Sequence, residues 1–482
     1  MHPSRNFDYR PRRTLFSEEQ PADMCSIERL PVLVAQNASL RQLLIGISLL
    51  ILLLGNLSLL RAQSPLEQYV AAGLESNLSL KQKSLSVEKS RQALREAKGL
   101  FMPQVSFQAS YSLAGGGRAL EFPIGDLLNP VYATLNQLTG SEQFPTNLAN
   151  VEEQFAPNNF QETKLRVVQP LFNSDIYFNY QAKQHLIGVE NATLKAYEQE
   201  LTKEIKTAYF GFLKTHAVLQ IYDETESLLQ EILRVNQRLV ENDKATRDAV
   251  YRAEYELSKL SQEVASAERQ QQTAQAYLNF LLNRPLGTEL EVDSLLQPES
   301  VSLALAELEN GALRQRAEIE QIDLAQAANL EAVALQKYSL LPQLNLVADV
   351  GFQGFGYNFS EQEYWLAALS LNWDLFQGFQ RQARQQQAQI DQQMLGLQRQ
   401  QLEQQIQLQV REAFFQMQAS QKAVVAAQSG LKSARQAFRI TQKKYAQDQA
   451  SLLALLDTRT QYTTAKLSLT IATYDWLSKV AE

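Results

Sequence analysis

The chain has 482 residues, of which 45% are apolar and 20% are charged, and its net charge is −7. So many apolar residues allow a large buried surface and argue against a disordered protein. An acidic chain is a poor partner for nucleic acid. The only cysteine is Cys25, so the rest of the chain forms no internal disulfide, and packing and assembly must stabilise it.

An apolar run near the N-terminus predicts a secretory signal. Residues 43–60 are apolar apart from Ser48, Asn56 and Ser58, with Arg41 before them. We expect an N-terminal extension and signal peptide over 1–62, cleaved after Ala62. A retained membrane anchor is the alternative, but the run is barely long enough to span a bilayer and carries polar residues. The extension holds more basic than acidic residues, so the mature part has a net charge of about −9.

The remaining sequence contains the same unit twice. Residues 76–111 and 315–350 each have a helical run, a proline and an alternating strand. Asn77 aligns with Arg316, and no gap separates them from Pro103 and Pro342. A duplicated unit of this length predicts one architecture made of two similar halves, residues 63–294 and 295–482.

Each half is predicted to contain three proline-free helices of unusual length. They cover 65–99, 175–241 and 247–284 in the first half, and 303–338, 379–446 and 450–480 in the second. A helix of about 67 residues spans about 100 Å, and one of about 35 residues spans half that length. Two short helices placed end to end therefore match one long helix. This arithmetic predicts a wall of antiparallel helices instead of a globule.

Four segments alternate between apolar and polar residues and are predicted to be strands. They cover 104–113, 160–171, 344–353 and 364–375. The second places Glu162, Lys164 and Arg166 on one face, which requires that face to be wet. Each strand alone also suits a β-sandwich of a soluble protein. Four strands connected to such long helices instead favour a membrane β-barrel with an apolar outer band.

The apolar faces of these strands carry large aromatic side chains. Trp365 and Trp373 are eight residues apart on one face, which places them roughly 20 Å apart along a barrel axis. With Phe107 and Tyr111 they form the predicted lipid-facing girdle. Four strands cannot close a barrel and an open edge is forbidden in lipid, so several chains must share one barrel.

The two hairpins differ in their loops. The second turns through the short, glycine-containing segment 351–363, whereas the first contains an insertion at about 114–159. The insertion is too long for a plain turn. We expect an extracellular loop with some local order that covers the mouth of the barrel.

This duplicated helix–strand–strand–helix–helix unit, with its signal segment and the joints Met102-Pro103-Gln104 and Leu341-Pro342-Gln343, resembles the TolC-like outer-membrane efflux protein family. The resemblance implies a mainly α protein with a membrane β-barrel, in which a homotrimer forms a twelve-stranded barrel and a twelve-helix tunnel. It places the barrel in the outer membrane of a Gram-negative bacterium and the helices in the periplasm. It also implies a passive exit duct that works with a periplasmic adaptor protein and an inner-membrane pump, of the resistance-nodulation-division or ATP-driven type.

The same resemblance points to residues at the inner mouth of the duct. The family has a tyrosine, an arginine and two aspartates there, and the aligned positions here are Tyr445, Ala450, Ala454 and Asp457. A ring of Asp457 carboxylates, one per chain, would favour cations. Since the arginine and the first aspartate are missing, we expect Arg247, Asp248 and Arg252 of the first repeat to pair with Asp457. The alternative is that these are ordinary surface charges at helix ends.

The predicted tip turns, where the long helices reverse, carry the adaptor contact in the family. The turn residues here are Asp243, Lys244, Asp448 and Gln449. The family often has glycine where Asp243 and Asp448 stand. Aspartate tolerates the left-handed backbone better than most residues, so the turns are expected to survive.

Enzyme signatures are absent from the sequence. There is no His-Glu-x-x-His, no Gly-x-Ser-x-Gly and no phosphate-binding loop. His185 and His216 stand on one long helix at no metal-ligand spacing, so we expect no cofactor and no metal. The alternative to a duct is a secreted coiled-coil structural or adhesion protein without a pore. The sequence leaves open whether a duct would carry small molecules or proteins.

Overall fold

Helices dominate the part of the chain that the computed structural model describes, residues 64–293 and 304–482. The predicted signal segment and its cleavage after Ala62 lie outside these residues. Within the described ranges, no helix is both long enough and apolar enough to cross a bilayer.

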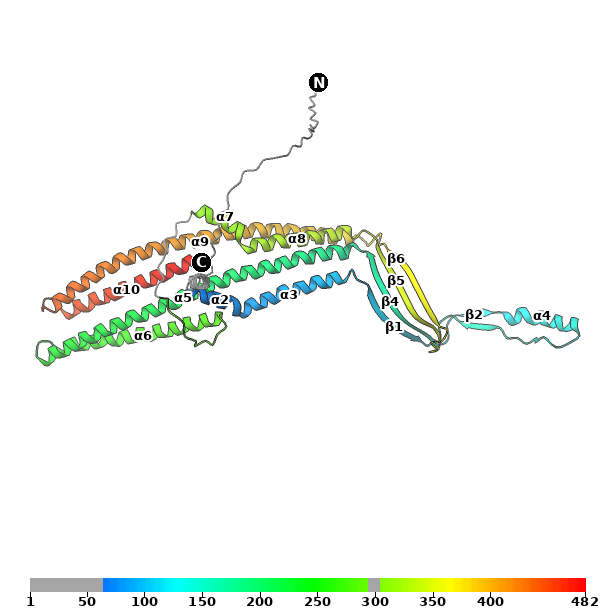
Figure 1. The fold of residues 1–482 in the computed structure, drawn as a ribbon, viewed down its shortest axis with the longest axis horizontal. Coiled ribbons are helices and arrows are strands. Elements are labelled where there is room, and N and C mark those ends of the chain that lie inside the picture. The colour runs from blue at the N-terminus through cyan, green and yellow to red at the C-terminus, as the bar shows by residue number, and fades with distance from the viewer. Residues whose placement is uncertain (1–63, 294–303) are drawn as a thin grey trace, which may run out of the picture. The chain divides into compact units, whose positions relative to one another are not determined.

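The two repeats contain the same elements in the same order (Figure 1). The first comprises α2 (Pro65–Ser76), α3 (Leu78–Gly99), β1 (Gln104–Ser112), β4 (Phe160–Phe172), α5 (Ser174–Glu241) and α6 (Arg247–Leu281). The second comprises α7 (Leu305–Gln315), α8 (Ala317–Tyr338), β5 (Gln343–Phe355), β6 (Glu363–Asn372), α9 (Gln380–Tyr445) and α10 (Leu452–Ala481). The insertion in the first hairpin contains β2 (Ala119–Phe122), α4 (Ile124–Thr139) and β3 (Val151–Gln154). The predicted long helices α5 and α9 are confirmed to within about one residue at each end.

The first helix of each repeat was expected to be continuous, and that prediction is wrong. It is interrupted at Asn77 in the first repeat and at Arg316 in the second, where the backbone becomes extended with ψ angles of 127° and 129°. Asn77 has a physical reason to break the helix. Its Oδ1 accepts from the Leu80 amide at 3.0 Å and so caps α3, while its Nδ2 donates to the Leu281 carbonyl at 2.9 Å, the last residue of α6. The side chain therefore satisfies two helix ends at one joint.

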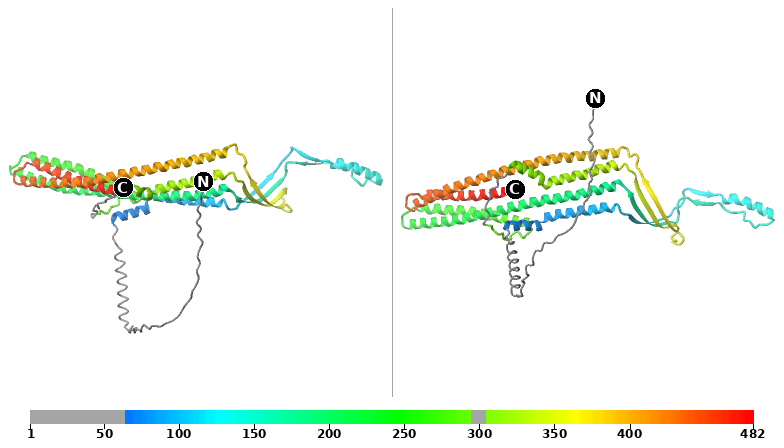
Figure 2. Two further views of the ribbon diagram at one scale, coloured as in Figure 1. Left: turned by 90° about the horizontal axis from the view of Figure 1, so that it is seen from above. Right: turned by 45° about the horizontal axis from the view of Figure 1, so that its top comes forward.

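The four long strands form one antiparallel sheet in the order β1-β4-β5-β6. The helices attached to them run side by side in the matching order α3, α5, α8, α9 (Figures 1 and 2). Further from the sheet, α6 packs on α5, and α10 packs between α5 and α9. The outer strands β1 and β6 each have one unpaired edge within the described chain.

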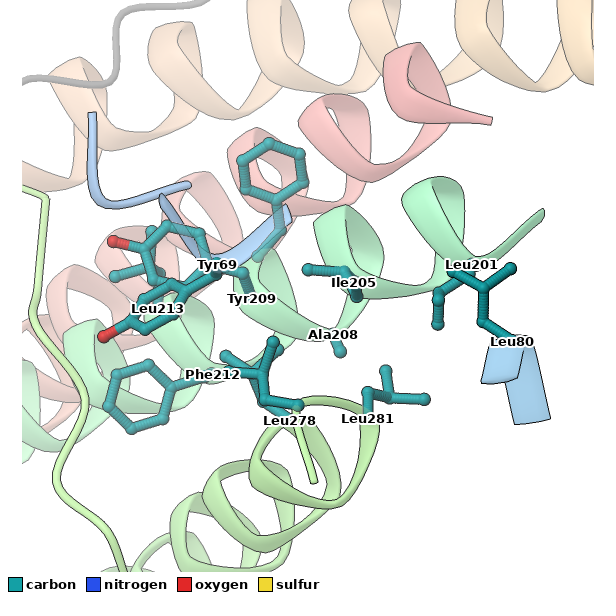
Figure 3. Packing of buried hydrophobic residues seen from close by; sticks show 12 residues of the cluster. Tyr69, Leu80, Leu201, Ile205, Ala208, Tyr209, Phe212, Leu213, Leu278 and Leu281 are labelled. Atoms are coloured by element: carbon teal, nitrogen blue, oxygen red, sulfur yellow. The ribbon is translucent and has the colours of Figure 1, made fainter. Parts of the chain in front are cut away.

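A hydrophobic cluster fastens α2, α5 and α6 at the level of the helix joint (Figure 3). Leu201, Ile205 and Leu278 are fully buried there, and burying a large apolar side chain stabilises by about 1.5–3 kcal/mol. Tyr209 lies beside them, and its hydroxyl donates to the Glu291 carbonyl and accepts from the Asp293 amide, both at 3.1 Å. Burial raises the pKa of Tyr209 to about 12. The cluster thus fixes both the helices and the chain segment that follows α6.

A second cluster lies nearer the turns that end α5 and α9. It brings together Leu229 of α5, Leu260 of α6, Phe438 of α9 and Leu455 of α10. The Phe438 ring stacks on Tyr462 with centroids 5.6 Å apart. Because side chains from all four helices share this core, the helix ends beyond it are held in a defined arrangement.

Candidate functional site

One face of the sheet consists of apolar side chains that have no cover within the chain. The strand register aligns Phe107, Leu165, Val350 and Trp365 in one row across β1, β4, β5 and β6. Their exposed fractions are 68%, 50%, 61% and 78%. Soluble proteins rarely expose a continuous apolar patch that extends across a whole sheet. The row therefore marks a surface that needs an apolar environment.

The aromatic residues predicted for the girdle all lie exposed, and two of them have anchored polar tips. The Tyr111 hydroxyl bonds to Asn159 Oδ1 at 2.5 Å at the loop end of β1. Trp373 follows β6 at the helix end, and its Nε1 donates to the Leu340 carbonyl at 2.9 Å. Amphipathic rings with one polar atom satisfied are typical of the two interfaces of a bilayer.

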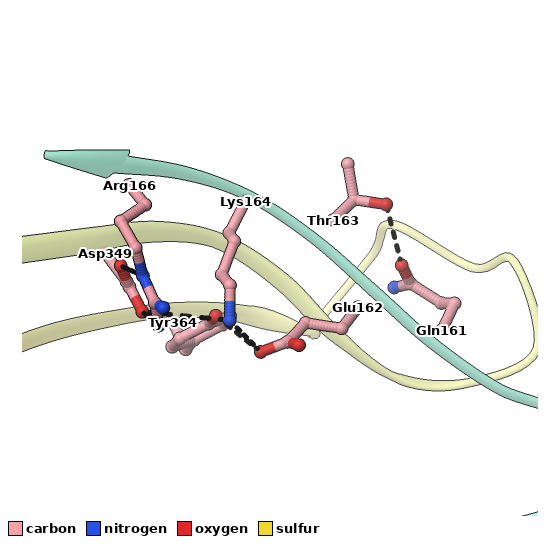
Figure 4. A network of polar contacts seen from close by, with 7 residues as sticks. All are labelled: Gln161, Glu162, Thr163, Lys164, Arg166, Asp349 and Tyr364. Carbon is pink, nitrogen blue, oxygen red and sulfur yellow. Dashed lines mark hydrogen bonds and ion pairs between the residues drawn. The ribbon is translucent and has the colours of Figure 1, made fainter. Parts of the chain in front are cut away.

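The opposite face carries a charged network that the sequence reasoning only partly anticipated (Figure 4). Arg166 donates from Nε and Nη2 to the two oxygens of Asp349 at 2.8 and 2.7 Å. Lys164 Nζ lies 2.8 Å from Glu162 and 3.8 Å from Asp349. The Tyr364 hydroxyl donates to Glu162 at 3.1 Å. The three predicted charges are therefore paired with one another and with β5 and β6, rather than merely solvated.

Two features of β5 allow this network. Asp349 stands directly opposite Arg166 in the register and is only 2% exposed. Gly351 stands opposite Lys164, and a Cβ there would lie 2.1 Å from the Thr163 carbonyl oxygen. Glycine thus lets the strands approach closely beside the lysine. The signal that could have revealed Asp349 was its place on the polar face of its strand, whereas its position opposite Arg166 depends on the register.

The two tip turns have the same backbone geometry. Asp243 and Asp448 both have φ = 59°, the left-handed region. The next residue closes each turn, since Lys244 N donates to Leu239 O at 2.7 Å and Gln449 N donates to Lys444 O at 2.8 Å. Aspartate therefore holds the glycine-type conformation in both repeats, as the sequence reasoning expected.

The charges predicted to meet at the inner mouth are not brought together within the described chain. Arg252 lies 3.6 Å from Asp248 on its own helix. A hydrogen bond donated by the Thr246 hydroxyl lowers the pKa of Asp248, and the nearby charge of Arg252 lowers it further. The exposed Asp457 accepts from Gln461 Nε2 at 3.0 Å. The expected pairing of the first-repeat charges with Asp457 is thus not present among the described contacts of the single chain, where Asp248 pairs with Arg252 and Asp457 with Gln461.

Tyr445 is fixed in the packed end of α9. Its hydroxyl donates to Asn236 Oδ1 at 2.9 Å, and Asn236 in turn donates to the Ile232 carbonyl. Burial raises the pKa of Tyr445. The residue predicted for the mouth therefore links α9 to α5 just before the tip.

The sequence reasoning missed a buried ion pair close to the tip. Arg459 of α10 donates from Nη2 to Glu256 Oε2 of α6 at 2.6 Å, and the two side chains are 6% and 23% exposed. The Arg459 Nε has no hydrogen-bond partner among the described residues. Because the pair joins α6 to α10 across the second cluster, it couples the turn of one repeat to that of the other. No spacing in the sequence marks a contact between residues so far apart.

The comparisons with known proteins agree with this geometry. Residues 308–482 match the family model of outer membrane efflux proteins. The outer-membrane channel OprN matches 86% of this chain with 88% of its own, at 19% identity and a TM-score of 0.67. The outer membrane protein VceC of Vibrio cholerae (15% identity, TM-score 0.68) and the open state of the MtrE channel of Neisseria gonorrhoeae (17%, 0.66) each match 86% of the chain, with 94% and 87% of their own. No curated protein matches the sequence. The family model thus matches most of the second repeat, and over most of its length the chain has the fold of these outer-membrane channels.

Proposed function

We propose that this protein is a passive exit duct of the outer membrane, formed by three copies of the chain. The observation that carries the proposal is the two-faced sheet. One face exposes a row of large apolar residues from Phe107 to Trp365, and the other holds paired charges around Asp349. Lipid outside and water inside account for both faces at once.

The free edges of β1 and β6 support the trimer. Backbone groups cannot remain unpaired in lipid, so β6 of one copy must pair with β1 of the next. Three four-stranded sheets would close a twelve-stranded barrel, while the helices continue into the periplasm as a tunnel. A secreted coiled-coil rod would have no use for an apolar face on a four-stranded sheet.

The partners follow from the position of the tips. The turns at Asp243, Lys244, Asp448 and Gln449 are the ends of the helices farthest from the sheet, and they are proposed to contact a periplasmic adaptor. An inner-membrane pump is proposed to supply the energy, since the sequence has no phosphate-binding loop with which to hold a nucleotide.

The experiment that tests the duct uses the full-length protein, purified in detergent. Native mass spectrometry should give a trimer, and the trimer should conduct ions in a planar bilayer. A monomer or dimer that stays soluble in buffer without detergent, and that gives no conductance, would refute the proposal.

The ring of Asp457 carboxylates at the inner mouth is a separate part of the proposal. Asp457 is exposed and charged near the tip, so one carboxylate per copy would favour cations. Asp457→Ala should lower the preference for cations over anions. Gln461→Ala is the matched control, because it removes the hydrogen bond to Asp457 and keeps the charge. Equal ion selectivity in the wild type and Asp457→Ala would reject the ring.

A further inference from the structure

The insertion between β1 and β4 is an ordered arm, here defined as residues 113–159. Its two stems pair as β2 and β3, and Phe155 N donates to Arg118 O at 2.9 Å beside them. The helix α4 lies beyond these strands (Figure 1). The arm therefore has a defined secondary structure that includes a helix, and it connects β1 to β4 at the loop end of the sheet.

One side of α4 is fastened to the returning chain of the arm. Asn129 exchanges two hydrogen bonds with the backbone of Leu148, at 2.9 and 2.8 Å. Asn136 does the same with Phe144, at 2.7 and 3.0 Å. The Tyr132 ring stacks on Phe144 with centroids 5.7 Å apart. These contacts fix the rotation of α4 about its own axis.

The other side of α4 has no cover. It presents Leu127, Val131, Thr134 and Leu138, here called the outer stripe, at a spacing of four, three and four residues. The three apolar members are 66%, 50% and 77% exposed. This spacing places all four on one face of the helix. Because the rotation of α4 is fixed with this apolar stripe outward, the stripe is available to bind a partner.

The charges of the arm favour one kind of partner. The outer stripe has no charged residue, whereas the arm around it has one basic residue and five acidic ones, Arg118 against Glu121, Asp126, Glu142, Glu152 and Glu153. Phosphate-bearing lipid headgroups would repel an arm of this charge. The stripe itself carries no charge, so it suits contact with another uncharged apolar stripe.

We infer that the outer stripe packs against the outer stripes of the other copies, so that three α4 helices meet above the mouth of the barrel. The inference rests on the proposed trimeric duct. The arm begins at the end of β1, whose free edge faces the neighbouring copy in the proposed trimer. The arm therefore continues the proposed β1–β6 interface beyond the sheet. A twelve-stranded barrel has a radius of about 12 Å, whereas α4 is about 24 Å long. Arms rooted on the rim therefore have the reach to meet at the axis.

The size of the stripe explains why the contact needs the trimer. Four side chains bury far less area than a stable interface between free proteins requires. Arms that are tethered to one rim have an effective concentration in the millimolar range, which makes a small apolar contact sufficient. The contact is thus expected within a trimer and not between separate chains.

Cysteine cross-linking in the intact trimer tests this contact. The background is the full-length chain with Cys25→Ser, into which Val131→Cys or Ala133→Cys is introduced. Val131 lies in the outer stripe, and Ala133 is also exposed but lies about 160° around the helix. Mild oxidation should link Val131→Cys into dimers at least about 5-fold faster than Ala133→Cys. The linked channel should also conduct less than the same channel after reduction.

Each outcome decides a different claim. Equal linking at the two positions, or none at Val131→Cys in a conducting trimer, overturns the inference and leaves the duct intact. Protection of Val131→Cys from a water-soluble maleimide that appears only with lipopolysaccharide vesicles, without linking, assigns the stripe to lipid and also overturns it. A reduced chain that is neither trimeric nor conducting refutes the proposed function itself.

Discussion

The buried ion pair between Glu256 and Arg459 gives the sharpest prediction about the tip. Glu256→Ala leaves the Arg459 guanidinium, 6% exposed, without its partner at 2.6 Å. Removing one member of a buried pair typically costs about 3 kcal/mol, because the remaining charge stays desolvated. Since 1.4 kcal/mol is a factor of ten, local opening of α10 should become about 100-fold more frequent.

Hydrogen exchange followed by mass spectrometry measures this opening in the peptide that covers the start of α10. Asp248→Ala is the matched control, because it removes an exposed pair with Arg252 near the same tip. It should leave exchange in α10 nearly unchanged. The double variant Glu256→Met with Arg459→Met should return exchange close to that of the wild type, since no buried charge remains. If Glu256→Ala and Asp248→Ala exchange alike in α10, the reasoning about the buried pair is wrong.

Three further predictions follow from the sheet, the tip and the core. Phe107→Lys on the apolar face should destabilise the assembled barrel by about 2–4 kcal/mol, whereas Ser106→Lys on the polar face should not. The amount of heat-resistant trimer on gels measures the effect, and an equal loss of trimer in both variants would contradict the assignment of the faces. Asp448→Val should destabilise its turn by about 1–2 kcal/mol and Asp448→Gly should not, because valine disfavours and glycine tolerates the left-handed backbone with φ = 59° at this position. Rates of tryptic cleavage at the tip measure the difference between the two variants, and identical rates would argue against this reasoning. Burial raises the pKa of Tyr209 to about 12 from an ordinary value of 10.0, so the unfolded chain ionises first and stability falls as the pH rises from 10 to 12. In thermal melts followed by circular dichroism, Tyr209→Phe should therefore lose less stability over that window than the wild type, and an equal loss would show that Tyr209 does not contribute.

Periodicity was sufficient for the two longest helices and for the four long strands of this fold. The proline-free runs predicted α5 and α9 to within about one residue, because the helical pattern and its limits are local properties. Alternation likewise predicted which strand face carries Phe107 and Trp365. The duplication indicated that the second repeat would copy the first, down to the matched turns at Asp243 and Asp448.

Contacts between distant residues were beyond the reach of these patterns. The break at Asn77 depends on the Leu281 carbonyl, which lies at the end of another helix. The pairing of Arg166 with Asp349 depends on the register between β4 and β5. In the same way, Asp248 and Asp457 found partners four residues away on their own helices, Arg252 and Gln461, because residues at that spacing are neighbours on a helix surface.

The sequence by itself determined the long helices α5 and α9, the four long strands with their two faces, and the twofold repetition, since each of these follows from the spacing of apolar residues along the chain. Only the tertiary structure decided which charges are paired, where the first helix of each repeat breaks, and that the arm holds α4 with its apolar stripe outward. The physical reason is that these features arise from side chains meeting across elements, and such meetings depend on register and rotation, which local spacing does not encode.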